Sequence, residues 1–296
     1  LTAGAHDPLG RPVQAGFALL GDGRTAVVET AAASGLALLR PSERDPKATT
    51  SYGTGELIRA ALDAGAETII VGLGGSATND GGLGMLTALG YRFLDETGRP
   101  AGIYGGDVAS VRAIDDGGVH PAVRQGTFNI ACDVTNPYTG DNGAAAVFGP
   151  QKGATPAQVQ LLNTGMAHLA ALLPNAVSAL PGAGAAGGLC GGLYGVLGGS
   201  TQSGFDLLAA LADLDSAIAG ADLVITGEGR TDRQTLMGKL PYQVAQRAKK
   251  LGKRCVVISG DGDGTLVGDK VITLTDEGTP PRAAIAHAAA LLAEKA

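Results

Sequence analysis

Two segments of the chain share one pattern: a short β-branched run, a polar glycine loop and the apolar periodicity of a helix. In the first, TIIVGLGG (68–75) leads into the loop GLGGSATNDGG (72–82), and the helix pattern follows. In the second, strand-like residues 222–226 and 254–259 flank a helix pattern at 244–250. Strands of this kind are buried in parallel sheets and joined by helices. The repeated pattern predicts an α/β fold.

Further elements fit this class. Residues 17–30 (FALLGDGRTAVVET) read as two strands around a Gly-Asp-Gly turn, and residues 53–65 read as a helix that Gly65 ends. A helix is predicted over 81–93 and a strand over 128–134. The glycine-rich segment 180–199 also carries Leu, Ala, Cys and Tyr, which predicts buried elements in tight contact rather than a linker.

Length and charge limit the classes of function. A chain of 296 residues favours two domains. With 22 Lys and Arg against 28 Asp and Glu, the net charge of −6 offers no general attraction to nucleic acid or an anionic membrane. No apolar run approaches the roughly 20 residues that a membrane span needs. We therefore expect small-molecule partners. The three widely spaced cysteines, Cys132, Cys190 and Cys255, are expected to be core thiols and indicate a reducing, cytoplasmic location.

The glycine loop after the first strand is a candidate anion site. Strands of an open α/β sheet end at the edge where ligands bind, and glycines there let backbone N–H groups approach a phosphate or carboxylate. The loop is neither a Walker sequence nor a good dinucleotide fingerprint. The alternative is a tight turn with close helix packing, in which Asp80 caps the following helix.

A second candidate is the charged segment TGEGRTDRQTLMGK (226–239). Glu228, Arg230, Asp232 and Lys239 lie in or soon after a loop at the carboxyl end of a strand. Carboxylates that hold magnesium and cations that neutralise a moving phosphoryl group are the requirements of phosphoryl transfer. The alternative is a solvated loop whose charges pair with one another.

A third candidate follows the strand 128–134. Asp133 lies in or at the end of this strand, with Asn136 just beyond, and a carboxylate in an apolar strand is costly unless it is paired or used. Two roles are therefore equally open for Asp133: a functional role in a binding or catalytic site, and a structural role as a capping residue. Lys152, between glycines in GPQKG, could meet an anion, but an exposed lysine is the default expectation. The four histidines form no metal or triad pattern.

Several of these motifs occur in the order found in one family. VGLGGSATNDGGLGMLTALGYRFLD, ACDVTNPYTGDNGAAAVFGPQKGATP, GAGAAGGL and ADLVITGEGRTDRQTLMGK resemble the type I glycerate kinases, as do DPLGRPV, TAAASGL and YGTGELI. The resemblance implies an ATP-dependent phosphotransferase that uses Mg²⁺ and converts D-glycerate to phosphoglycerate, with the 2-phosphate favoured.

The resemblance also implies two α/β domains with the active cleft between them. Residues 8–205 would form an inserted restriction-enzyme-like domain. Residues 206–296 would form the C-terminal part of a flavodoxin-like (Rossmann-like, parallel-sheet) domain. The family's N-terminal motifs resembling DSFKG and ADGGEGT do not occur in this sequence. We therefore expect an incomplete form of the enzyme, with weak binding and slow or no turnover.

Roles follow from the resemblance and the loop chemistry together. An anionic group, either the glycerate carboxylate or a nucleotide phosphate, is expected at Gly72, Gly74, Gly75, Ser76, Thr78, Asn79 and Asn136. Asp80 and Asp133 are candidates for magnesium ligand or for the base that orients the hydroxyl. Glu228 and Asp232 are further catalytic candidates, and Arg230 and Lys239 are phosphate-binding candidates.

Alternatives stay open at this stage. One is a non-catalytic relative, for example a regulatory or dimer-forming protein, and a weaker one is an NAD-dependent oxidoreductase that uses the GLGG loop. The sequence is compatible with a homodimer. It is also compatible with hydroxypyruvate or tartronate as ligands in place of glycerate.

Overall fold

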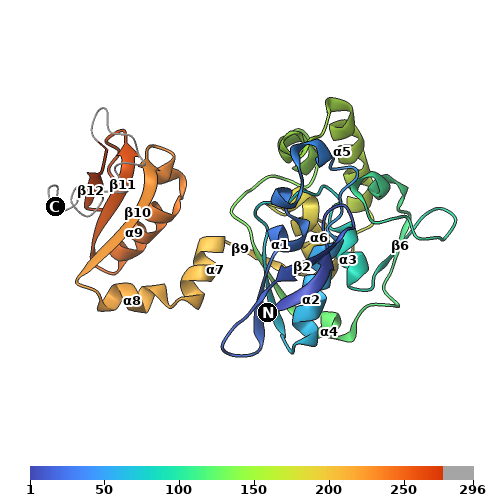
Figure 1. Cartoon of the computed structure of the whole chain (residues 1–296), viewed down its shortest axis with the longest axis horizontal. Helices are drawn as coiled ribbons and strands as arrows, with labels where there is room; N and C mark the ends of the chain where they lie inside the picture. Colours follow the sequence, from blue (N-terminus) through green and yellow to red (C-terminus); the bar gives the residue numbers. More distant parts are fainter. Residues whose placement is uncertain (276–296) are drawn as a thin grey trace. The chain divides into compact units, whose positions relative to one another are not determined.

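The chain divides into two compact units, Leu1–Gly204 and Phe205–Ala296. The computed structural model describes residues 1–275, and residues 276–296 of the expected C-terminal domain lie outside the described residues. Each unit has its own cluster of buried apolar side chains. The division falls one residue before the expected boundary; the assignments to restriction-enzyme-like and flavodoxin-like domains stay predictions. In Figure 1 the first unit runs from blue to yellow and the second from orange to red.

The first unit is built on a five-stranded sheet. Its order is β3 (Ala18–Leu19), β4 (Thr25–Glu29), β5 (Thr68–Gly72), β8 (Thr127–Ala131) and β9 (Ser200–Gln202). The strands from β4 to β9 are parallel, and β3 joins β4 as the predicted antiparallel hairpin. Gly72 is in register with Glu29 on one side and with Ala131 on the other. The carboxyl ends of β4, β5 and β8 therefore meet at one edge, and the α/β prediction is confirmed.

Helices pack on this sheet and on one another. Contacts join α2 to α3 and β4, and join α6 to β8 and α3. The helices of this unit are α1 (Thr30–Ser34), α2 (Tyr52–Asp63), α3 (Leu83–Ala88), α4 (Pro121–Gln125), α5 (Pro156–Ala170) and α6 (Leu189–Leu197). Gly65 follows α2 with φ of 98°, the left-handed conformation in which helices commonly end. The prediction that segment 180–199 is buried is confirmed around α6, where Leu189, Cys190 and Leu193 are fully inaccessible.

The helix predicted over 81–93 is shorter than expected. It ends at Ala88 because Gly90 has φ of 102° and its α-carbon lies against the backbone of Gly118, leaving no space for a side chain. The residues beyond it form β6 (Arg92–Leu94), which pairs antiparallel with β7 (Ala113–Asp115). A second small hairpin, β1 (Thr2–His6) with β2 (Pro12–Gly16), lies at the start of the chain.

As far as Thr275, where the described residues end, the second unit is a three-stranded parallel sheet with helices. The sheet order is β10 (Leu223–Thr231), β11 (Arg254–Gly262) and β12 (Lys270–Thr273), and α9 (Leu240–Lys250) packs on β10 and β11. Two short helices, α7 (Gly204–Leu211) and α8 (Leu214–Gly220), precede the sheet. Both predicted strands exist, but β10 runs five residues beyond its predicted end at 226 because its pairing with β11 continues to Thr231.

Candidate functional site

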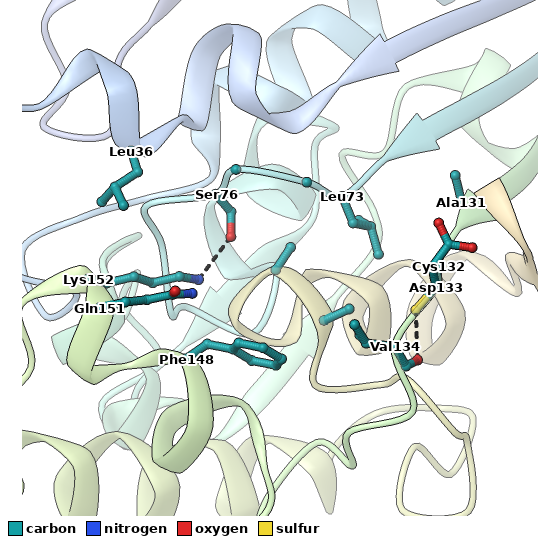
Figure 2. A pocket seen from close by; sticks show the side chains of 14 residues that line it. Leu36, Leu73, Ser76, Ala131, Cys132, Asp133, Val134, Phe148, Gln151 and Lys152 are labelled. Atoms are coloured by element: carbon teal, nitrogen blue, oxygen red, sulfur yellow. Dashed lines mark hydrogen bonds between the residues drawn. The ribbon is translucent and has the colours of Figure 1, made fainter. Parts of the chain in front are cut away.

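A cavity of about 410 Å³ opens in the first unit at the carboxyl ends of β5 and β8. The segment from Leu73 to Ser76 continues from β5, and the segment from Ala131 to Val134 continues from the end of β8. The wall is completed by Leu36, Phe148, Gln151, Lys152, Ala185 and Ala186. Figure 2 shows Lys152 and Gln151 on one side of the pocket and Asp133 on the other. This is the edge of a parallel sheet where ligands of α/β proteins bind.

The glycine loop lines this cavity and carries backbone donors that are not used within the protein. The amides of Gly74, Gly75 and Ser76 donate no hydrogen bond to any described residue. The loop is held by its neighbours: Leu36 N donates to Gly75 O at 2.8 Å, and Gly75 adopts φ of 71°, which favours glycine. Amides left unpaired in a fixed loop can receive an anion. Gly72 lies outside the cavity wall, because its place is in the sheet between Glu29 and Ala131.

Thr78, Asn79 and Asp80 lie behind the loop, not in the cavity wall. All three are fully buried. Thr78 O accepts a hydrogen bond from Lys152, and Asn79 Nδ2 donates to the sulfur of Met166 at 2.9 Å. Among the described residues, Thr78 Oγ1 and Asn79 Oδ1 have no hydrogen-bond partner. Direct contact between these side chains and a ligand in this cavity is not supported by their positions.

The Asp80 carboxylate serves the packing of the loop. It accepts hydrogen bonds from Ser51 N and Ser51 Oγ, both at 2.7 Å, and from the amides of Gly82 at 3.1 Å and Gly84 at 3.2 Å. Burial raises its pKa, and these hydrogen bonds oppose the rise. With four donors already bound and no exposed surface, Asp80 fits the capping alternative and does not fit the role of a metal ligand in this cavity.

Lys152 is the functional candidate that sequence reasoning undervalued. The default expectation of an exposed lysine is wrong, because only 2% of its surface is accessible. Its Nζ donates to Ser76 Oγ at 2.9 Å and to Thr78 O at 2.7 Å. Burial lowers the Lys152 pKa from 10.5 to about 7. The one signal in the sequence was its place between two glycines: Gly149 packs against the backbone of Ala145, and Gly153, with φ of 97°, packs against the backbone of Arg44.

Asp133 stands in the cavity wall two residues after β8 ends. Its Oδ1 accepts from Gly204 N at 2.9 Å and from Ser203 Oγ at 3.1 Å, so the side chain has a fixed orientation, and the residue is exposed. The prediction that Asp133 lies at a strand exit is confirmed. Asn136 does not reach the cavity, because its side-chain amide donates to Asn142 O at 3.0 Å within the following loop.

Cys132 and Ala186 give the cavity wall two further chemical features. The expectation of core thiols is confirmed for Cys190 and Cys255, which are buried, whereas Cys132 packs against the core but is partly accessible and lines the cavity. A hydrogen bond with Cys190 lowers the pKa of Cys132 to about 7. Ala186 has φ of 54° and ψ of 38°, a left-handed conformation that costs energy in a residue with a side chain.

In the second unit the predicted charged residues form a network of their own. Glu228 and Arg230 lie within β10 rather than in a loop, Asp232 follows the strand, and Lys239 precedes α9. Lys239 Nζ is 3.5 Å from Asp232 Oδ1 and 3.7 Å from Glu228 Oε2. Arg230 Nη1 is 3.4 Å from Asp261 Oδ2. Self-pairing, which the sequence left open, is therefore present, although Arg230 and Lys239 remain accessible to a ligand.

Within residues 1–275, no group of three or more His, Cys, Asp or Glu side chains is placed to hold a metal ion. Kinases commonly bind Mg²⁺ through one or two carboxylates together with nucleotide phosphates. Asp133 fits such a partial site, since its Oδ2 accepts no hydrogen bond from a described residue.

None of the described helices is long and apolar enough to cross a membrane.

Comparison with known proteins gives one consistent result. The family model "Glycerate kinase family" matches residues 1–296. Glycerate kinase of Bacillus subtilis (strain 168) is 49% identical over 86% of this chain and 67% of its own length. Glycerate 2-kinase of Escherichia coli (strain K12) is 47% identical over 86% of this chain and 68% of its own length. The chain thus aligns with about two thirds of each relative.

A solved structure agrees with these relatives. The crystal structure assigned to glycerate kinase 2 of Salmonella typhimurium LT2 superposes with a TM-score of 0.88 and 44% sequence identity, covering 98% of this chain and 79% of that one. The resemblance seen in the ordered motifs is confirmed, and the dinucleotide-oxidoreductase alternative loses its basis. With a family match from the first residue to the last and a common fold at 44% identity, the chain belongs to the glycerate kinase family.

Proposed function

We propose that this chain takes part in transfer of the ATP γ-phosphate to D-glycerate, giving 2-phosphoglycerate and ADP, with the acceptor bound in the cavity of the first unit. The observation that carries the proposal is the polarity of that cavity. One side offers three unpaired amides and the Lys152 ammonium, and the other side offers the Asp133 carboxylate. A small hydroxy acid has the complementary pair of groups, an anion and a hydroxyl.

Asp133 would position the acceptor hydroxyl. Phosphoryl transfer depends mainly on placing the nucleophile in line and on stabilising charge, and an aspartate that accepts the hydroxyl proton is the usual positioning group. The hydrogen bonds from Ser203 and Gly204 occupy Oδ1 and leave Oδ2 for this contact. Apolar wall residues, among them Leu73, Phe148 and Ala185, suit the short carbon skeleton and limit access of water.

The charged residues of the second unit are proposed as contacts for the nucleotide. Arg230 and Lys239 are accessible cations that can bind phosphate oxygens, and Glu228 and Asp232 hold Lys239 in place. Mg²⁺ bound with the nucleotide would neutralise charge on the transferred phosphoryl group. Cytoplasmic location and a homodimer stay predictions.

A coupled ADP-release assay with D-glycerate, ATP and Mg²⁺ tests the proposal. We expect ADP release that depends on D-glycerate and a product that ³¹P NMR identifies as the 2-phosphate. Asp133→Asn should lower turnover by about 10²- to 10⁴-fold, the range for a positioned acid or base. Asp141→Asn, in an exposed loop, is the matched control. An unchanged rate in Asp133→Asn removes that residue from the mechanism.

The same assay addresses the non-catalytic alternative. If the chain neither releases ADP nor binds D-glycerate in calorimetry, the non-catalytic relative becomes the better explanation.

A further inference from the structure

Lys152 is a buried cation that has no carboxylate at ion-pair distance among the described residues. Resting on the proposed function, we propose that Lys152 determines specificity: it recognises the carboxylate of the acceptor and so selects a hydroxy acid over a neutral polyol of the same size. Three properties of the site support this role: the donors that Lys152 has already used, the donors that surround it and the charge of the opposite wall.

The hydrogen bonds of Lys152 leave one N–H for a ligand. A lysine ammonium has three donors, and two are used on Ser76 Oγ and Thr78 O. Both acceptors are neutral groups. Asp80 is the charged group that favours the protonated lysine, but its own oxygens are bound to Ser51, Gly82 and Gly84. Burying an ammonium without a direct counter-ion is costly, and an anion in the cavity would supply one.

The contact with Ser76 adds a further donor to the set. Because Ser76 Oγ accepts from Lys152, its own hydroxyl proton points elsewhere, and it donates to no described residue. This hydroxyl therefore joins the free amides of Gly74, Gly75 and Ser76 at the cavity wall. Four neutral donors and one cation on one side of a small cavity match the two oxygens and single charge of a carboxylate.

A carboxylate fits this set better than a nucleotide phosphate. The lining contains one cation, Lys152, and no arginine, whereas sites that hold di- or triphosphates supply several positive charges. The lining also contains Asp133, which would repel a highly charged anion. A three-carbon acid avoids this repulsion because its carboxylate can lie at Lys152 while its uncharged hydroxyl lies at Asp133, on the opposite side of the pocket in Figure 2.

Isothermal titration calorimetry on the whole chain tests the inference. The probes are D-glycerate, its uncharged analogue D-glyceramide, and ADP, and the proteins are wild type, Lys152→Met and Lys47→Met. Lys47 is a partly accessible lysine in the same unit with no ion pair among the described residues, so its variant controls for loss of one positive charge. Circular dichroism establishes that each variant is folded.

We expect wild type to bind D-glycerate at least about 30-fold more tightly than D-glyceramide. Lys152→Met should lower D-glycerate affinity on the order of 100-fold, as for the loss of one partner of a buried charge pair. Its affinities for D-glyceramide and ADP should stay within about threefold, and Lys47→Met should match wild type. Loss of discrimination between acid and amide is a result that a merely structural lysine would not produce.

Three results would overturn the inference. One is equal binding of acid and amide by wild type, which needs no variant to be informative. The second is D-glycerate affinity within about threefold of wild type in Lys152→Met. The third is a loss of ADP affinity alone, which would assign the anion site to a phosphate. The ADP-release assay distinguishes failure of this inference from failure of the proposed function. If D-glycerate binding depends on Lys152 but no ADP is released, the role of Lys152 stands and the proposed reaction is wrong. If Lys152→Met turns over with an unchanged KM for D-glycerate, the proposed reaction stands and the role of Lys152 is wrong.

Discussion

Replacing Lys152 by methionine should stabilise the unliganded protein at neutral or slightly acidic pH, although it should impair binding. Methionine has a similar length and no charge, so it can fill the same buried space. The wild-type side chain pays an electrostatic cost that the ligand, not the fold, would relieve. Stability lost at a functional position in this way is a common compromise in enzymes.

The magnitude follows from the pKa of the buried ammonium. Burial lowers this pKa from 10.5 to about 7, a difference of about 3.5. At 1.36 kcal/mol for each pKa unit, the charged form costs roughly 5 kcal/mol. Methionine would leave Thr78 O without its donor, and an unsatisfied buried group costs about 1–3 kcal/mol. The balance is a gain of about 2–4 kcal/mol in the free energy of unfolding.

The gain should depend on pH with a definite sign. Below about pH 7 the lysine is protonated in both the folded and the unfolded chain, so the full cost is present. Between about pH 7 and 10.5 the unfolded chain binds a proton that the folded chain does not, and wild-type stability rises with pH through this linkage. The advantage of Lys152→Met should therefore be largest near pH 6.5 and absent by about pH 9.5.

Urea unfolding followed by tyrosine fluorescence is a suitable assay. The protein has no tryptophan, and of its six tyrosines only Tyr242 lies in the second unit, so the signal reports mainly on the unit that contains Lys152. Lys47→Met should change the free energy of unfolding by less than about 0.5 kcal/mol at both pH values. A Lys152→Met variant that is equally destabilised at pH 6.5 and 9.5 would refute the reasoning, because the ammonium would then carry no burial cost.

Two further predictions concern buried and accessible groups around the same cavity. Asp80→Asn should lower the free energy of unfolding in urea by about 3 kcal/mol, because the amide NH₂ would face the N–H and O–H donors that now bind the carboxylate. Asp141→Asn is the exposed control. Equal stability of the two variants would contradict the capping role of Asp80. Iodoacetamide should alkylate Cys132 ahead of Cys190 and Cys255, with a rate that rises through about pH 7 and falls when D-glycerate is added. Peptide mass spectrometry measures this, and equal labelling of all three thiols would exclude a cavity position for Cys132.

Local sequence was sufficient to predict the elements around the site. The β-branched run at 68–72, the Gly-Asp-Gly turn and the amphipathic face of α2 are patterns of neighbouring residues, so their signals survive without tertiary contacts. The family is also readable from the sequence, because ordered motifs accumulate along the chain. The predicted bounds were wrong at the ends of two elements, because contacts with neighbouring segments set those ends. β10 continues because β11 pairs with it, and α3 stops because Gly90 packs on Gly118.

The orientation of the polar side chains was not predictable in the same way. Ser76, Thr78 and Asp80 are alternate residues of one loop, yet Ser76 lines the cavity and the other two lie behind it. Residues 77–79 adopt no regular secondary structure, so the alternation of side chains that a strand would impose does not hold there.

The sequence by itself determined the α/β class, the family and the place of the glycine loop, since each depends on residues close together in the chain or on motifs in order. The tertiary structure decided the composition of the cavity. Lys152 meets Ser76 across 76 positions of sequence, and its burial depends on how the 150–152 turn packs against the loop after β5. The glycines that flank Lys152 do not by themselves distinguish it from an exposed lysine, because desolvation comes from the surrounding atoms and not from the residue itself.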